Sequence, residues 1–239
     1  MNRVKTLILA LLLLFPSVSG ARNLYMLSIG VSDYPGTAYD LILAAQDATD
    51  MYRLFQQNNN ANSVLLTNRL AHKARILSEA KAMFRKAGPD DIVILFFSGH
   101  GTQGGFNVYD GLLSYDEIRL LFSNCKAQNK MIFADACFSG DIREGSLSNQ
   151  ADPRNNIMLF MSSRGNETSG ENPRYMRNGL FTACLIRSLK GGGDLNRDRI
   201  ISAKELFIAV SEGVKELSNN RQHPVMWGNY DDKMPVMIW

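Results

Sequence analysis

The chain has 239 residues, of which 45% are hydrophobic. This is enough apolar material for one well-packed domain that needs neither disulfides nor structural metals. The 26 basic and 23 acidic residues are scattered along the chain and leave a formal net charge of only +3, so we exclude nucleic acid as a partner.

Residues 1–20 have the order of a secretory signal peptide. Two basic residues precede an apolar run (7–15), and a proline and small residues follow it. The run is shorter than the roughly 20 residues that a membrane-spanning helix needs, which disfavours the alternative of an uncleaved anchor. We therefore expect cleavage before Ala21 and a folded domain over residues 22–239. The mature protein would be secreted or periplasmic, without stable membrane association.

The chain contains three cysteines, namely Cys125, Cys137 and Cys184. Because three is an odd number, at least one thiol must stay free or pair with another molecule. A leftover thiol in a protein exported to an oxidising compartment calls for a functional explanation.

From Leu24 onward, short apolar runs typical of buried strands alternate with longer amphipathic runs typical of helices. Strands are predicted at 24–31, 63–67, 91–99, 130–136 and 156–163. Helices are predicted at 41–57, 72–88, 114–123 and 179–191. Ser114 and Glu117 have the spacing of a capping box at the start of the third helix. This alternation indicates a three-layer α/β fold in which helices cover both faces of a mostly parallel sheet.

Two of the predicted strands end in residues suited to nucleophilic catalysis. In open parallel sheets, reacting groups gather just beyond the carboxyl ends of the strands. The stretch "DIVILFFSGHG" carries His100 to that edge, and "KMIFADACFSG" carries Cys137. An imidazole near a thiol can take its proton and later give a proton to a leaving amine, so the pair predicts a catalytic dyad. The N–H groups of Gly101 and Cys137 are the predicted donors to an oxyanion.

The alternative interpretation makes Cys137 a small core residue and His100 an incidental loop histidine. We disfavour it because the chain has only three histidines, and His100 stands between two glycines at a strand end.

The stretches "FFSGHG" and "DACFSG" together resemble the caspase and metacaspase group of cysteine peptidases, in its bacterial caspase-like branch. The segments "LYMLSIGVSDYPG", "LAAQDATDMYRLF" and "NGLFTACLIRSL" extend the resemblance over nearly all of residues 22–239. The Gln-Ala-Cys of animal caspases is Asp-Ala-Cys here, which is the metacaspase-like form. The resemblance implies a caspase-like fold and an endopeptidase with His100 as general base and acid and Cys137 as nucleophile.

The resemblance also implies a pocket for the residue that precedes the scissile bond. Asp135 would line this pocket, Asp47 would assist it, and Ser98 would face it. Two carboxylates in a partly dry pocket need a cationic guest to offset their repulsion and desolvation, so we expect peptide or protein substrates cut after Arg or Lys. The alternative makes Asp135 a helix-capping or structural acid and Asp47 a solvated helix residue. The chain departs from the family at Ala44, where metacaspases commonly carry a second cysteine.

The stretch "DLNRDRIISAKE" (194–205) has the spacing of an EF-hand calcium loop. Its candidate ligands, at positions 1, 3, 5, 7, 9 and 12, are Asp194, Asn196, Asp198, the carbonyl of Ile200, Ser202 and Glu205. Position 6 holds Arg199 where such loops need glycine. The alternative is a polar turn followed by the start of a helix. The predicted chemistry requires no cofactor, and calcium is the one metal that the sequence suggests.

The segment 140–156 is rich in Gly, Ser, Asn and charge, which predicts an exposed loop. It contains Arg143 and Arg154, so an enzyme that prefers basic residues would find candidate sites for self-cleavage there. A second class of function stays open: a caspase-fold module that binds peptides or partners, responds to calcium and has little peptidase activity.

Overall fold

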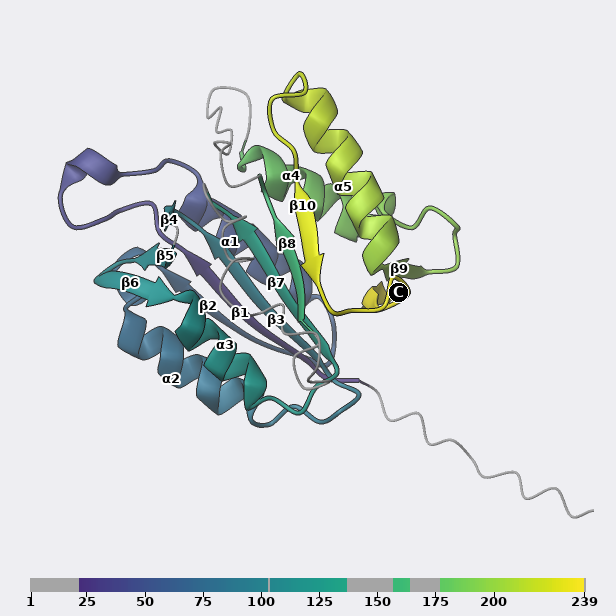
Figure 1. The fold of residues 1–239 in the computed structure, drawn as a ribbon, viewed down its shortest axis with the longest axis horizontal. Helices are drawn as coiled ribbons and strands as arrows, with labels where there is room; N and C mark the ends of the chain where they lie inside the picture. The colour runs from purple at the N-terminus through teal and green to yellow at the C-terminus, as the bar shows by residue number, and fades with distance from the viewer. Residues whose placement is uncertain (1–21, 103, 137–156, 164–176, 239) are drawn as a thin grey trace, which may run out of the picture.

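The computed structural model describes residues 22–102, 104–136, 157–163 and 177–238. Its centre is a six-stranded sheet in the order β10-β8-β7-β3-β1-β2, covered by helices on both sides (Figure 1). Neighbouring strands run parallel, except that β10 is antiparallel to β8. The strands are β1 (Leu24–Gly30), β2 (Ala61–Thr67), β3 (Ile92–Ser98), β7 (Asn129–Asp135), β8 (Ile157–Met161) and β10 (Val225–Gly228).

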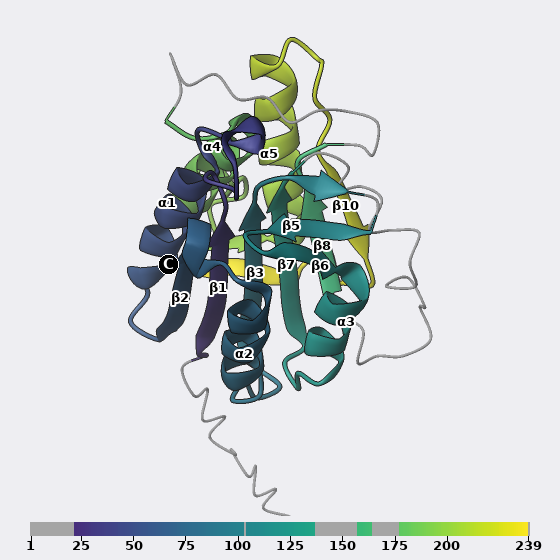
Figure 2. The same cartoon turned by 90° about the vertical axis from the view of Figure 1, so that its left-hand side faces the viewer.

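Two hydrophobic cores lie on opposite faces of this sheet. The first packs under α2 (Lys73–Phe84) and α3 (Tyr115–Ser123), and the second packs under α1 (Ala44–Gln56), α4 (Leu180–Arg187) and α5 (Ala203–Leu217). Figure 2 shows α2 and α3 in front of the sheet and α5 behind it. Every residue of β3 is buried, and its side chains alternate between the two cores as a pleated strand requires.

Two small antiparallel sheets lie outside the central one. One contains β4 (Gly101–Thr102), β5 (Gly105–Val108) and β6 (Gly111–Ser114), and the other pairs β9 (Ile200–Ser202) with β11 (Pro235–Ile238). Short helical turns also occur: η1 (Thr37–Tyr39) and η2 (Asn68–Leu70) are 3-10 helices, and η5 (Ser188–Gly192) is a π turn.

The predicted three-layer fold is confirmed. The predicted capping box is also present, because the Glu117 amide donates to Ser114 Oγ and the Ser114 amide donates to Glu117 Oε2. The helix predicted over 72–88 ends at Phe84, since the amides of Lys86 and Ala87, just before Gly88, make turn hydrogen bonds in place of helical ones. The last predicted helix leaves α-geometry at Arg187 and continues as η5.

No helix in the described part of the chain is long and apolar enough to cross a membrane. The expected signal peptide (1–20) and the expected loop (140–156), with Arg143 and Arg154, lie outside the described residues. Both stay predictions.

Candidate active site

The carboxyl ends of β3 and β7 lie side by side. The two strands are parallel, and Ser98 at the end of β3 is in register with Asp135 at the end of β7. The amide of Gly99 donates to the Asp135 carbonyl at 3.2 Å, which extends this pairing one residue past β3. Side chains alternate along a strand, so Ser98 and Asp135 both point to the face that α1 and α4 cover.

Asp47 lies on that same face, in the first turn of α1. Its side chain is only 1% exposed. Ser98 Oγ donates to Asp47 Oδ2 at 2.9 Å, and the amide of Gly179 donates to Asp47 Oδ1 at 2.9 Å. Asp47 is therefore a buried carboxylate that contacts the end of β3 and the start of α4.

Asp135, which is 6% exposed, lies at the N-terminus of α4. Its Oδ2 accepts hydrogen bonds from the Thr182 amide (3.1 Å) and hydroxyl (2.8 Å). The backbone amides at a helix N-terminus favour a negative charge. A Cβ atom on Gly179 would lie 2.6 Å from Asp135 Oδ2 and 3.1 Å from Asp47 Oδ2, so both carboxylates converge on this glycine.

The surroundings of Asp47, including Asp135, shift its pKa. Burial raises the pKa of Asp47 well above its ordinary value, and the negative charge of Asp135 raises it further. Hydrogen bonds from Ser98 and Gly179 lower this pKa without cancelling the rise. The structure thus brings together Asp47, Ser98 and Asp135, as the sequence predicted. Gly179 and Thr182 are not among the predicted site residues, although both lie in the stretch "NGLFTACLIRSL" that resembles the family.

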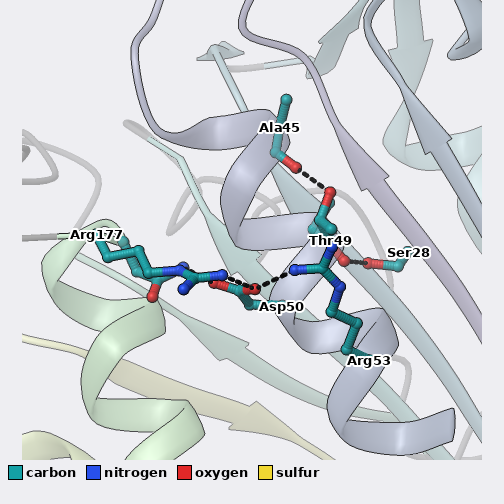
Figure 3. Close-up of polar contacts among 8 residues, drawn as sticks. Ser28, Ala45, Thr49, Asp50, Arg53 and Arg177 are labelled. Carbon is teal, nitrogen blue, oxygen red and sulfur yellow. Dashed lines mark hydrogen bonds and ion pairs between the residues drawn. The ribbon is translucent and has the colours of Figure 1, made fainter.

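A second carboxylate of α1 anchors the chain that leads to Gly179. Arg177 donates from Nε and Nη2 to the two oxygens of Asp50, both at 3.1 Å, and Asn178 donates to Asp50 at 3.2 Å. Arg53 approaches the same carboxylate at 3.4 Å, on the other side (Figure 3). Segment 177–179 is thereby fixed to α1 one helical turn beyond Asp47.

His100 follows β3 and is held from two sides. Its Nε2 lies 2.8 Å from the carbonyl oxygen of Tyr39, and a carbonyl can only accept, so Nε2 must carry the hydrogen. In the neutral ring Nδ1 is then the basic nitrogen. The His100 amide donates to the Tyr34 hydroxyl at 2.9 Å, and this hydroxyl donates to the Asn107 carbonyl at 3.1 Å. Burial raises the pKa of Tyr34 to about 12, so its hydroxyl keeps its proton.

Cys137, the predicted nucleophile and oxyanion donor, lies outside the described residues. The residue before it, Ala136, is buried and fixed, because its amide donates to Ser162 Oγ and its carbonyl accepts from the same hydroxyl, both at 3.2 Å. Gly101, the other predicted oxyanion donor, begins β4 directly after His100.

Of the described cysteines, Cys125 and Cys184 are both buried and free. Burial raises the pKa of both thiols, and raises that of Cys184 to about 11. Neither therefore has the thiolate character of a nucleophile at neutral pH.

The model of the caspase domain, peptidase family C14, matches residues 25–234. The chain belongs to this family of cysteine peptidases. The resemblance inferred from the two central motifs is confirmed. No curated protein sequence matches the chain.

Solved structures share the caspase-like fold. A protein from Geobacter sulfurreducens is similar with a TM-score of 0.71 and 19% sequence identity, over 90% of this chain and 99% of that one. Caspase-1 from Spodoptera frugiperda is similar with a TM-score of 0.64 and 14% identity, over 87% of each chain. At such identities the likeness supports the fold and no finer property.

The predicted calcium loop of this caspase domain is described in full. Arg199 has a φ of 69°, the left-handed conformation that glycine adopts at this position of an EF-hand. The two oxygens of Asp194 accept from the Asp198 and Arg199 amides, and Asp198 Oδ1 accepts from the Ile200 amide.

The last two candidate ligands form a capping box at the start of α5, where the Glu205 amide donates to Ser202 Oγ. The amide of Ser202 donates to Glu205 Oε2, and the amide of Asn196 donates to Glu205 Oε1. Among the described residues, no group of three or more His, Cys, Asp or Glu side chains is arranged to hold a metal ion. Calcium binding stays a prediction.

Proposed function

We propose that the protein is an exported caspase-like cysteine endopeptidase that uses His100 and Cys137 and cleaves after Arg or Lys. The observation that carries this proposal is the pair of buried carboxylates, Asp47 and Asp135, which converge on Gly179 at the edge of the sheet where His100 leaves β3.

Strand register supports the dyad. Ser98 is level with Asp135 in parallel neighbouring strands, which lie about 4.8 Å apart. His100 follows Ser98 by two residues, and Cys137 follows Asp135 by the same two. Because His100 and Cys137 each follow a residue of this paired position by two, we expect their side chains to emerge at the same edge of the sheet. A proton could then pass between them.

The proposed reaction proceeds in two displacements. Nδ1 of His100 takes the proton of the Cys137 thiol, and the thiolate attacks the scissile carbonyl carbon. The C–N bond breaks as the imidazolium returns its proton to the departing amine, which leaves a thioester. Water then gives a proton to His100 and its oxygen to the acyl carbon, the C–S bond breaks as the imidazolium returns that proton to the Cys137 sulfur, and the carboxylic acid product leaves. The Tyr39 carbonyl orients the ring throughout by accepting from Nε2.

The acidic pair supports the preference for a basic residue. Asp47 is destabilised as an anion by burial and by Asp135, and an incoming guanidinium or ammonium would replace this repulsion with attraction. Asp135 precedes Cys137 by only two residues. The charged end of the substrate side chain would therefore lie at the acidic pair while the carbonyl carbon of the same residue lies at Cys137.

Hydrolysis of arginyl peptides by point variants tests the proposal. We expect His100→Ala and Cys137→Ala each to lower kcat/KM by about a thousandfold or more, and His223→Ala, which changes a half-buried histidine that contacts Asn220 outside the site, to leave it unchanged. An arginyl chloromethyl ketone should alkylate Cys137 alone, because Cys125 and Cys184 are buried thiols with raised pKa values. Undiminished hydrolysis by Cys137→Ala would refute the dyad. Binding of the arginyl peptide without turnover or alkylation would favour the peptide-binding module instead.

A further inference from the structure

A hollow of about 470 Å³ opens beside His100. Its wall contains the imidazole ring of His100 and mostly apolar side chains. The side chains of this wall include those of Tyr34, Pro35, Tyr39, His100, Val108 and Leu112. Tyr34 and Val108 are buried at 8% and 2% exposure, whereas Tyr39 and Leu112 stand open to solvent at 69% and 40%. Two large exposed hydrophobic side chains therefore flank an already built apolar recess.

The lining of the hollow selects against charge. Among the described residues that line it, none is an Asp, Glu, Lys or Arg. Burying an unpaired charge there would be unfavourable, whereas an aromatic or branched apolar side chain would remove a large hydrophobic area from water. The recess is thus chemically opposite to the acidic pair.

The hollow and the acidic pair also lie on opposite sides of the sheet edge. Tyr34 and Val108 belong to the core under α2 and α3, whereas Asp47 lies in α1 and Asp135 contacts α4, on the other face. His100 lies between them at the carboxyl end of β3. A peptide that crosses this edge with its basic side chain at the acidic pair would continue toward the hollow after the scissile bond.

The proton transfer fixes which residue of the peptide reaches the hollow. The departing amine takes its proton from His100, so the nitrogen of the residue after the scissile bond must come within hydrogen-bond distance of that ring. His100 itself lines the hollow. The side chain of the residue directly after the scissile bond is therefore the one that lies beside the hollow.

We propose that this hollow is the subsite for the residue directly after the scissile bond and that it takes a large aromatic or branched apolar side chain. The inference rests on the proposed function, and it adds a second specificity: a basic residue before the bond and an apolar one after it.

Matched peptides test the subsite. They carry Arg before the bond and Phe, Leu, Ser or Asp after it, and kcat/KM is measured for each. We expect the Phe and Leu peptides to be cut about tenfold or more faster than the Ser peptide, and the Asp peptide slowest, as apolar contacts of this size discriminate. Arginine methyl ester, whose methanol leaving group has no side chain, reports the dyad without the hollow.

Variants of the wall assign the preference to the hollow. Leu112→Asp and Tyr39→Ser should each reduce the Phe-to-Ser ratio of kcat/KM toward one, and both positions are exposed enough to tolerate the change. Leu217→Asp alters a leucine of similar exposure (56%) on α5 and should keep the ratio. Because each ratio is taken within one variant, a general effect on activity cancels.

Each failure has a distinct signature. Equal rates for the Phe and Ser peptides, with methyl ester hydrolysis that depends on Cys137, would overturn the subsite and leave the proposed function standing. Wall variants that accelerate every substrate equally would indicate that part of this chain or another copy occupies the hollow, and would also overturn it. Ester hydrolysis that survives Cys137→Ala would refute the proposed function, and the subsite with it.

Discussion

Asp47 is destabilised as an anion in the folded protein, and this has a consequence for stability. Burial, and then the charge of Asp135, raise its pKa above the unfolded value, which is about 3.9. Between the unfolded and folded pKa values the folded state binds more protons, so the free energy of unfolding falls as pH rises through this range. The destabilisation is fully present above the folded pKa and absent below about pH 3.9.

Asp47→Asn should therefore stabilise the folded protein and at the same time slow its hydrolysis of arginyl peptides. The amide oxygen can still accept from Gly179, and the amide nitrogen can donate to Ser98, so packing and hydrogen bonding are kept. We expect a melting temperature a few degrees above that of the unmodified protein at pH 8, since about 1 kcal/mol corresponds to roughly 2–4 °C for a domain of this size. The difference should vanish near pH 4. Hydrolysis of arginyl peptides should fall tenfold or more.

Melting curves from pH 4 to pH 8, with Asp90→Asn as control, check this prediction. Asp90 is an exposed carboxylate outside the site, so its replacement should leave the pH profile unchanged. A melting temperature that drops at pH 8 in Asp47→Asn would mean that the ionised carboxylate stabilises the fold, which contradicts the argument.

Some residues of the candidate site were predictable one by one, and others were not. Ser98 and Asp135 end apolar strands, and polar residues in that place are informative in any parallel sheet. Gly179, Thr182 and Tyr34 meet the site through contacts between elements far apart in the chain. No local periodicity encodes such contacts, so they could only be seen in the structure.

At the scale of elements, the joint between α1 and the N-terminus of α4 sets the geometry of the acidic pair. The Asp50–Arg177 ion pair fixes segment 177–179, whose last amide donates to Asp47. Arg177 is 67% exposed, so the pair itself contributes less than about 1 kcal/mol to stability. The ion pair would therefore affect the position of segment 177–179 and hardly the free energy of unfolding.

We expect Asp50→Asn to raise KM for arginyl peptides several-fold, because segment 177–179 loses its bidentate anchor, and to leave kcat and the melting temperature nearly unchanged. Arg53→Ala is the matched control, since it removes a weaker, 63% exposed partner of the same carboxylate and keeps the Arg177 contact. A parallel fall of kcat and melting temperature would show a purely structural role. An unchanged KM would show that the anchor does not position the pocket.

Elements were predictable where their signal was long. Runs such as 91–99 and 130–136 are continuous and apolar, and they correspond to β3 (Ile92–Ser98) and to β7 (Asn129–Asp135), which begins one residue earlier than predicted. The strands β4 to β6 have four residues or fewer and contain Gly, Thr and Asn, which is too short for a period of two to be evident. The start of α5 agrees with the alternative interpretation of residues 194–205, a polar turn followed by a helix, because Ser202 and Glu205, considered as calcium ligands, form its capping box.

At the scale of the whole molecule, the sheet separates the two buried thiols. Cys125 belongs to the core on one face and Cys184 to the core on the other. A disulfide needs Cβ atoms about 4 Å apart, so these two cannot pair without unfolding. The fold therefore prevents a disulfide between Cys125 and Cys184.

Export is the remaining property of the whole chain that the proposal requires. The apolar run 7–15 is long enough for a signal peptide and short for a membrane anchor. We expect the exported protein to begin at Ala21 when its N-terminus is sequenced. Leu11→Arg, which places a charge inside the run, should block export and leave an uncleaved precursor in the cytoplasm. Leu217→Asp, which changes an exposed leucine of the folded domain, should not. An exported chain that still begins at Met1 and sediments with membranes would establish the anchor instead.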